Sequence, residues 1–350
     1  MPDIRKYEKV LNFLMKDGYS FSFLCEQDIP LHKAFVERNW PGAVTRGSFD
    51  YNKWKLGTRA DGNINLLVCK KDGQIVGQIS YIAQQLVIDG QTHDCYWGCN
   101  FMVDAAYKGA GIGAALEVYA LKYFPIILGN APTLDSLKYK EAIGFKTLVG
   151  PTIMMLPLKA DYFLKLKLHG SNKNVLRLIS TAVNPFMSVY WSVKFANAAV
   201  WKQTTIEEIL PLIRTKQEYL DAPHVLHDNN FYAWRFNTPQ QFKKKEVEIL
   251  RSDKGSYFIY KRSAALVYLY EFHFTNQQQL RSALKYIWKT ERDATTIKVF
   301  ANSTGEQSFF KKAGFFSFRT KGLVTAYSEK GLFNNVERMH VDIIDGDGDI

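Results

Sequence analysis

Three glycines at alternate positions mark the part of the sequence best suited to chemistry. The segment Lys108-Gly-Ala-Gly-Ile-Gly113 stands between an apolar run and the pattern of an amphipathic helix. Glycines let a backbone approach a phosphate without Cβ clashes, and the free N–H groups and dipole of the following helix attract the anion. We therefore predict a phosphate-binding loop here, in preference to a glycine turn that binds nothing.

Two other phosphate-binding loops fit this spacing poorly. Dinucleotide-binding folds use G-x-G-x-x-G in an early strand–helix unit, whereas this loop reads G-x-G-x-G about 100 residues into the chain. A P-loop ends in Gly-Lys-Ser/Thr, but here Gly113 is followed by two alanines.

The loop needs a strand before it and a helix after it, and the sequence supplies both. Residues 96–103 form an apolar run that leads into the loop, and residues 114–124 have a helical pattern that stops at Pro125. Upstream, Asp72-Gly73 separates two apolar runs and predicts a β-hairpin. Downstream we expect a short buried strand at 126–130 and a helix at 133–143.

The second half of the chain repeats this order weakly. A strand, Asn130, a helix and Gly144-Phe145 in the first half match a strand, Asn302, a helix and Gly314-Phe315 in the second. The period of about 170 to 180 residues is too long for a solenoid and fits a duplicated domain.

We therefore predict an α/β (α+β) fold with two domains, each a mixed, mostly antiparallel sheet flanked by helices. The first spans 1–158, a helical connector spans 159–201, and the second spans 202–350. Basic and apolar residues alternate in the connector, so it either packs between the domains or lies on a membrane surface. The second domain has Thr275-Asn-Gln-Gln-Gln in place of the glycines, and we expect it to shape the acceptor site or a dimer.

This order of elements resembles the GNAT superfamily of acyl-CoA-dependent N-acetyltransferases. Their signature is Arg/Gln-x-x-Gly-x-Gly/Ala, and Lys108, Gly111 and Gly113 stand at its first, fourth and sixth positions. The resemblance covers roughly 20–157 and, as an eroded copy, 202–325. The tandem layout also resembles bacterial acetyltransferases found with surface-polysaccharide genes, through Trp234-Arg-Phe-Asn-Thr-Pro239 and Gly346-Asp-Gly-Asp349.

The resemblance implies an acetyl-CoA site on this loop. Phe101 and Val103, on the strand before the loop, would pair with the pantetheine arm, and Asn130 would contact it. A strand N–H there would polarise the thioester carbonyl. The backbone amides implied to hold the pyrophosphate are those of Lys108, Gly109, Ala110, Gly111, Ile112, Gly113 and Ala114.

The catalytic side chains follow the resemblance less closely. Many GNAT enzymes place a tyrosine acid four residues before the Gly-Phe step, where this chain has Lys140. Tyr139 is one residue early, which on a helix rotates the side chain by about 100°. We keep Tyr139 as the candidate acid, with a packing tyrosine as the alternative, and read Lys140 as a solvated lysine or a cation for the thiolate. His93 is the candidate base, with a solvated turn histidine as the alternative.

Three residues are candidates for acceptor binding. His224 precedes the second tryptophan motif and could reach a cleft between the domains. Trp54 and Trp234 occupy matching positions in the two halves and are either core aromatics or stacking partners for a sugar.

The composition limits the class of protein. The 350 residues are 47% hydrophobic, which argues against disorder, and no apolar run reaches the roughly 18 to 20 residues of a membrane span. The first residues lack an apolar signal region, so we expect a cytoplasmic protein. The net charge of +11 suits a phosphorylated ligand, but no DNA-binding helix stands out.

The four cysteines form no metal or disulfide pattern. They contain no CxxC pair and have no histidine pair at ligand spacing, so we expect free thiols and no metal site. They are Cys25, Cys69, Cys95 and Cys99.

Together these features predict an acyltransferase that moves an acetyl group from acetyl-CoA to a small-molecule amine. By the narrower resemblance the acceptor is an amino sugar, nucleotide-linked or free, in cell-surface glycan synthesis. Two alternatives stay open: an aminoacyl transferase that uses charged tRNA for peptidoglycan, and a non-catalytic acyl-CoA-binding scaffold. A homodimer is compatible with the sequence, which gives no oligomeric state.

Overall fold

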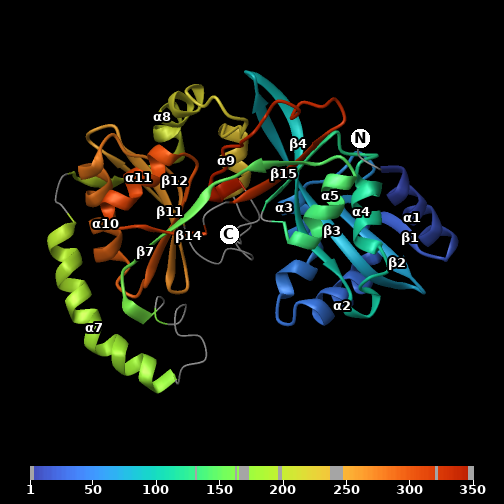
Figure 1. Cartoon of the computed structure of the whole chain (residues 1–350), viewed down its shortest axis with the longest axis horizontal. Helices are drawn as coiled ribbons and strands as arrows, with labels where there is room; N and C mark the ends of the chain where they lie inside the picture. The colour runs from blue at the N-terminus through green and yellow to red at the C-terminus, as the bar shows by residue number, and fades with distance from the viewer. Residues whose placement is uncertain are drawn as a thin grey trace.

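A computed structural model describes residues 4–130, 132–161, 164, 173–195, 199–236, 247–319 and 322–345. The chain forms two lobes, each built on a mixed sheet with helices packed against it, and the predicted fold class is confirmed (Figure 1). Pro239, the 346–349 ending and residues 165–172 of the predicted connector lie outside the described residues.

The first lobe carries the sheet that holds the glycine loop. Its strand order is β1-β2-β3-β4-β5-β15-β6, with β9 paired to β3, and its one parallel pair is β4 with β5 among the described strands. The strands are β1 Ser20–Leu24, β2 Ile64–Lys71, β3 Gln74–Ile88, β4 Gln91–Val103, β5 Ile126–Asn130, β6 Lys146–Val149, β9 His224–Val225 and β15 Leu323–Ser328.

Two tight turns fix the register of these long strands. Asp72 and Gly73 join β2 to β3, and Asp89 and Gly90 join β3 to β4, all four with positive φ. Positive φ at both central residues gives the type I′ turn that suits a twisted hairpin. The Asp72-Gly73 hairpin prediction is confirmed.

Helices cover both faces of this sheet. Apolar residues of α1, α4 and α5 form one core with the alternate strand residues Leu67 and Cys69, while Leu66 and Val68 point to the other core. The helices are α1 Ile4–Lys16, α2 Ile29–Asn39, α3 Phe49–Leu56, α4 Ile112–Ala120 and α5 Leu134–Ala142. The sequence analysis did not predict α1, which packs on α4.

The second lobe repeats the plan with the strand order β14-β7-β13-β12-β11-β10-β8. Its strands are β7 Thr152–Pro157, β8 Trp201–Gln203, β10 Val247–Ser252, β11 Tyr257–Ser263, β12 Leu266–His273, β13 Thr296–Ala301 and β14 Phe316–Arg319. Its helices are α7 Lys173–Lys194, α8 Ile206–Glu218, α9 Asn229–Phe236, α10 Gln277–Thr290 and α11 Thr304–Ala313. No helix in the described part of the chain is long and apolar enough to cross a bilayer.

The two lobes exchange a strand. β7, from the first half of the sequence, pairs with β13 and β14, while β15, from the second half, pairs with β5 and β6. Both crossing strands run between the lobes in Figure 1. A cut at residue 158 therefore does not separate the two sheets, and we keep the two-domain division as a proposal with these strands exchanged.

Each sheet opens where its parallel pair ends. β4 and β5 pair only at Tyr96–Gly98 with Ile127–Gly129, and β12 and β13 pair only at Leu266–Tyr268 with Thr296–Lys298. Beyond these residues the strands diverge and leave strand edges without a neighbour in the sheet. The strand before the glycine loop, β4, therefore separates from β5 in a V.

Candidate active site

A cavity of about 500 Å³ lies where β4 and β5 separate. Its walls come from β4, β5, α4, α5 and β15, so segments far apart in the sequence meet there. Cavities of this size hold small ligands and cofactor arms.

Two glycines form the apex of the cavity. Gly98 and Gly129 are the last parallel pair, and both line the cavity. A Cβ added to Gly129 would lie 2.7 Å from Thr325 Oγ1 and 3.7 Å from Lys140 Nζ. The lysine ammonium therefore stands beside the apex.

A buried ion pair closes this end of the cavity. Lys140 Nζ lies 2.5 Å from Glu117 Oε1, and the Glu117 side chain is 1% exposed. The other carboxylate oxygen, Glu117 Oε2, has no hydrogen-bond partner among the described residues. Of the two interpretations of Lys140, the structure excludes a solvated side chain and leaves a cation inside the site.

Tyr139 shares the cavity with Lys140. Its hydroxyl has no hydrogen-bond partner in the described part of the chain. Burial, reinforced by the Glu117 carboxylate, raises the pKa of Tyr139 above its ordinary value. The phenol is therefore neutral, and the rotation of about 100° between neighbours on a helix does not remove Tyr139 from the cavity.

Several buried polar atoms near the apex of the cavity lack hydrogen-bond partners. Buried polar atoms in folded proteins nearly always have partners, yet Glu117 Oε2 and the hydroxyls of Tyr81 and Tyr139 have none among the described residues. Burial, with Glu117 and Tyr139 nearby, raises the pKa of Tyr81 well above its usual value. Polar atoms left open in this way at a cavity are suited to a polar ligand.

The glycine loop lies at the other end of β4. A short 3-10 turn, Ala105–Tyr107, is followed by Gly109 and Gly111 with φ of 88° and 82°. Gly111 caps α4 in the left-handed region, where a side chain is disfavoured. A Cβ there would also come within 2.8 Å of Val10 on α1.

The loop presents free amides at the start of α4. The first hydrogen bond of the helix runs from Ala115 N–H to the Gly111 carbonyl at 3.0 Å. The N–H groups of residues 111–114 therefore have no carbonyl partner within the helix. The amides of Lys108 and Ala110 donate within the loop, at 3.4 and 3.3 Å. Of the seven predicted amides, those at the helix start are therefore the ones best placed for an anion.

The other predicted cofactor contacts lie on β4 and β5. Phe101 lines the cavity, and its ring lies so close to Gly113 that an added Cβ would be 2.7 Å from Cζ. Val103 packs on the core beside α4, and Asn130 lines the cavity at the end of β5. Beyond Gly98, β4 has β3 on one side and its other edge free.

His93 and His224 do not reach this cavity. His93 faces Leu86 near the hairpin tip and lies five residues from Gly98, roughly 16 Å along an extended strand. His224 is in β9, where its Nδ1 lies 3.0 Å from the Ala222 carbonyl oxygen and burial lowers its pKa.

The two predicted tryptophans meet each other between the lobes. Their rings stack with centroids 6.3 Å apart, and Trp234 Nε1 donates to the Trp54 carbonyl at 3.0 Å. Trp234 also lines a second cavity of about 270 Å³, together with Asp94 and Asp228. α9, which carries Trp234, packs in the core on the sheet face opposite α4.

Sequence reasoning assigned no role to two residues of the site, Glu117 and Thr325. Glu117 was visible as the single charge in an otherwise apolar helix, which is an available signal for a buried functional group. Thr325 had no such signal, because it reaches the site through the exchanged strand β15.

The corresponding place in the second lobe is occupied by the chain itself. The segment around Ile343–Asp345 packs on β12, and Val341 N–H donates to Asn302 Oδ1 at 2.9 Å. Asn302 is the counterpart of Asn130 in the repeat. At the start of α10 the Asn276 side chain accepts from Gln279 N–H at 3.0 Å, so this helix start is capped internally.

A buried network of charged side chains holds the Ile343–Asp345 segment against the second lobe. His227 Nδ1 and Nε2 lie 3.1 and 2.5 Å from Glu271 and Asp345. Burial alone would lower the pKa of His227, but the two carboxylates outweigh it and raise that pKa to about 10. The imidazolium therefore donates from both nitrogens and offers no lone pair to a metal.

Comparison with known proteins identifies the fold. Residues 33–126, which include β4, the glycine loop and α4, match the Acetyltransferase (GNAT) family. The structure is similar to a GCN5-related N-acetyltransferase from Kribbella flavida, with 11% identity and a TM-score of 0.54 over 87% of this chain and 70% of that one.

Two further solved structures have a similar fold. A GCN5-related N-acetyltransferase from Anabaena variabilis has 9% identity and a TM-score of 0.53 over 87% of this chain and 72% of that one. The Saccharomyces cerevisiae N-myristoyltransferase with bound myristoyl-CoA has 10% identity and a TM-score of 0.54 over 89% and 82%. No curated protein matches the sequence. The chain has the GNAT acyltransferase fold.

Proposed function

We propose that the first lobe binds acetyl-CoA and transfers its acetyl group to an amine. The observation that carries this proposal is that Phe101 lines the cavity between β4 and β5 and also lies against Gly113 in the first turn of α4, so the cavity adjoins the free amides of that helix. The pyrophosphate would bind those amides, and the pantetheine arm would lie along the free edge of β4.

The acyl group is proposed to be short. The apex of the cavity is lined by Lys140 and Glu117 rather than by an apolar tunnel. Burying a long alkyl chain against a charged pair would forfeit the apolar contacts that stabilise it. An acetyl group leaves this pair undisturbed.

The residues at the apex can take up the proton that the acceptor nitrogen loses and supply the proton that the thiolate gains. The acceptor nitrogen attacks the thioester carbonyl carbon, the C–S bond breaks, and the acyl group moves to nitrogen as an amide. The nitrogen gives a proton to Glu117 Oε2 and the thiolate takes one from the Lys140 ammonium; the protonated Glu117 carboxyl then gives its proton to the neutral Lys140 amine, its partner in the ion pair, which restores both groups. Tyr139 would donate a hydrogen bond to the developing thiolate.

The acceptor is proposed to be an amino sugar, free or nucleotide-linked, that enters between the lobes. The 270 Å³ cavity there has two carboxylates, Asp94 and Asp228, beside the Trp234 ring, a combination suited to hydroxyl or ammonium groups and a sugar face. Asp94 is four residues from Gly98, roughly 13 Å along the strand. An acceptor that touches both places must therefore be extended.

The proposal is tested by acetyl transfer to a panel of amino sugars and sugar nucleotides, with release of free CoA thiol as the readout. We expect turnover with an extended amino-sugar acceptor, a rise in KM without a change in kcat for Trp234→Leu, and loss of kcat for Lys140→Met. Turnover that is unaffected by Lys140→Met would overturn the assigned proton route.

A further inference from the structure

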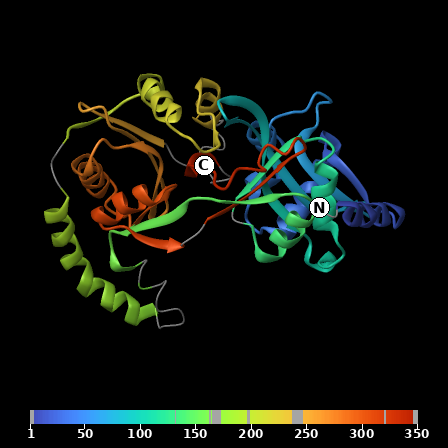
Figure 2. The same ribbon diagram turned by 45° about the horizontal axis from the view of Figure 1, so that its top comes forward.

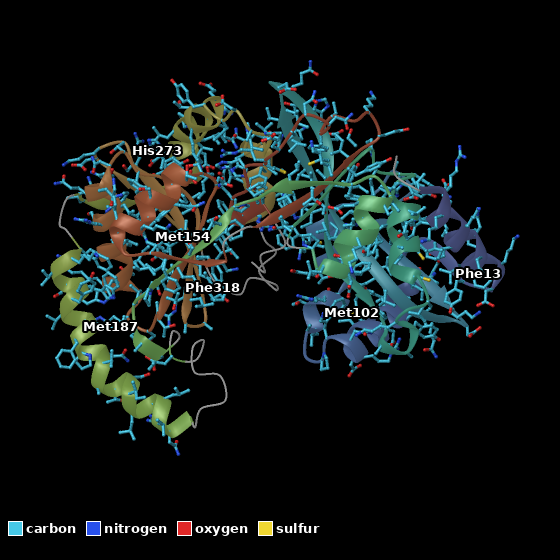
Figure 3. All side chains as sticks on the ribbon, in the orientation of Figure 1. Phe13, Met102, Met154, Met187, His273 and Phe318 are labelled. Atoms are coloured by element: carbon cyan, nitrogen blue, oxygen red, sulfur yellow. The ribbon has the colours of Figure 1, made fainter. Side chains whose placement is uncertain are left out.

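Helix α7 lies along the outer edge of the second lobe, away from the first (Figures 1 and 2). It contacts the lobe through one face. Trp191 stacks on Phe195 with centroids 5.0 Å apart, and its Nε1 donates to the Pro157 carbonyl at 3.1 Å. Met187, labelled on α7 in Figure 3, packs against the same core.

The opposite face of α7 is apolar and exposed. Eight large apolar side chains recur there at spacings of three and four residues, which places them on one stripe of the helix. Their exposed fractions run from 37% to 82%; they are Val175, Leu178, Ile179, Val183, Phe186, Val189, Tyr190 and Val193. A surface helix normally turns its apolar stripe inward, and a continuous exposed stripe marks an interaction surface.

The sequence segment that contains this stripe is basic. The sequence has no acidic residue between Asp161 and Glu207, and the same stretch has six cations, Lys165, Lys167, Lys173, Arg177, Lys194 and Lys202. Lys194 lies at the margin of the stripe, where its Nζ donates to the Tyr190 hydroxyl at 2.7 Å. On the opposite side of the helix, a cavity between α7 and the lobe is lined by Lys159, Lys289 and Arg292, and Asn184 of α7 donates to Asp161 at 2.9 Å.

We propose that α7 docks in the headgroup region of an anionic lipid bilayer, with its apolar stripe inserted and its cations at the lipid phosphates. An exposed apolar stripe on a helix with three cations, Lys173, Arg177 and Lys194, and no acidic residue is complementary to such a surface. A second copy of the same face would instead bring like charges together. Since no described helix can span a bilayer, the contact is a peripheral one.

The experiment is co-sedimentation of the full chain with vesicles of phosphatidylcholine alone or with 30% phosphatidylglycerol. The test variant is Leu178→Glu, Phe186→Glu, Val193→Glu, at residues 72%, 78% and 82% exposed. Its matched control, Phe13→Glu, Val44→Glu, Tyr219→Glu, changes the charge equally at residues 68%, 83% and 80% exposed on other elements. Thermal stability confirms that each variant is folded.

We expect binding to anionic vesicles that weakens with salt, at least about tenfold weaker binding by the α7 variant, and unchanged binding by the control. Equal binding by both variants would overturn the assignment to α7. So would failure of the parent to bind, or equal binding to neutral vesicles. A parent dimer in light scattering that only the α7 variant dissociates, without vesicle binding, would identify a second copy as the occupant and also overturn it.

Discussion

Lys140 Nζ lies 2.5 Å from Glu117 Oε1 at the apex of the cavity, while Glu117 Oε2 has no partner among the described residues. This arrangement holds a cation beside the point where β4 and β5 separate and leaves one buried carboxylate oxygen without a hydrogen-bond partner among the described residues. The two residues come from α4 and α5, and the account of catalysis depends on them as a pair.

The first prediction separates the catalytic role of the pair from its structural role. Lys140→Met should lower kcat by about 10²- to 10⁴-fold, because the thiolate loses its proton donor. It should also destabilise the fold, because Glu117 is left as an unpaired buried carboxylate. Adding Glu117→Gln should restore much of the stability but none of the activity, as measured by thermal unfolding and CoA release. Recovery of both would assign the pair a purely structural role.

Tyr139→Phe provides a second, milder test. The hydroxyl has no partner among the described residues, so its removal should leave the free energy of unfolding nearly unchanged. A hydrogen bond to the developing thiolate predicts a fall in kcat of about 10- to 100-fold. An unchanged kcat would mean that Tyr139 only packs.

The stoichiometry of binding tests the difference between the lobes. The Ile343–Asp345 segment packs on β12, and Asn276 caps α10, so the described residues of the second lobe lack, at this matching position, the uncapped helix start that the first lobe has beside its cavity. Isothermal titration should give one acetyl-CoA per chain. Two sites per chain would contradict the view that the second lobe lacks a donor site.

The buried network of the second lobe predicts a dependence of stability on pH. His227 has a folded pKa of about 10 against 6.5 for an ordinary histidine, so its stabilising contribution is complete below pH 6.5 and is lost as the pH rises through 10. Burial tends to raise the pKa of Glu271, but the charges of His227 and Lys216 outweigh it and lower that pKa. The contribution of Glu271 to stability is therefore lost as the pH falls into the acid range.

His227→Gln should therefore reduce the free energy of unfolding by about 3 to 5 kcal/mol at pH 6. Denaturant unfolding at several pH values measures the difference from the parent, which should shrink toward pH 10. A difference that does not change with pH would show that His227 is not charged in the folded state.

Local patterns of the sequence predicted much of the fold. The Asp72-Gly73 hairpin, the strand before the loop, α4 and α5 follow from turn residues and apolar periodicity, which act over a few neighbours. The exchange of β7 and β15 between the sheets could not be predicted in this way, because both strands carry ordinary apolar patterns and their partners lie far away in the sequence.

The site was predictable to a similar extent. The glycine loop was predicted from its spacing, and Phe101 and Asn130 from the resemblance; both of these side chains line the cavity, and Phe101 also lies against Gly113 of the loop. The pairing of Lys140 with Glu117 depends on how α4 and α5 pack together. The positions of His93, His224 and Trp54 likewise depend on tertiary packing, which single-residue chemistry does not specify.

A thermal-shift titration with acetyl-CoA tests the central claim most directly. The loop variant is Gly109→Asp and its control is Gly62→Asp, because both glycines have positive φ, 88° and 82°, and open space around an added Cβ. We predict saturable stabilisation of the parent and of Gly62→Asp, and little or none of Gly109→Asp, whose carboxylate would repel the pyrophosphate. No stabilisation of the parent, or equal stabilisation of both variants, would contradict an acetyl-CoA site on this loop.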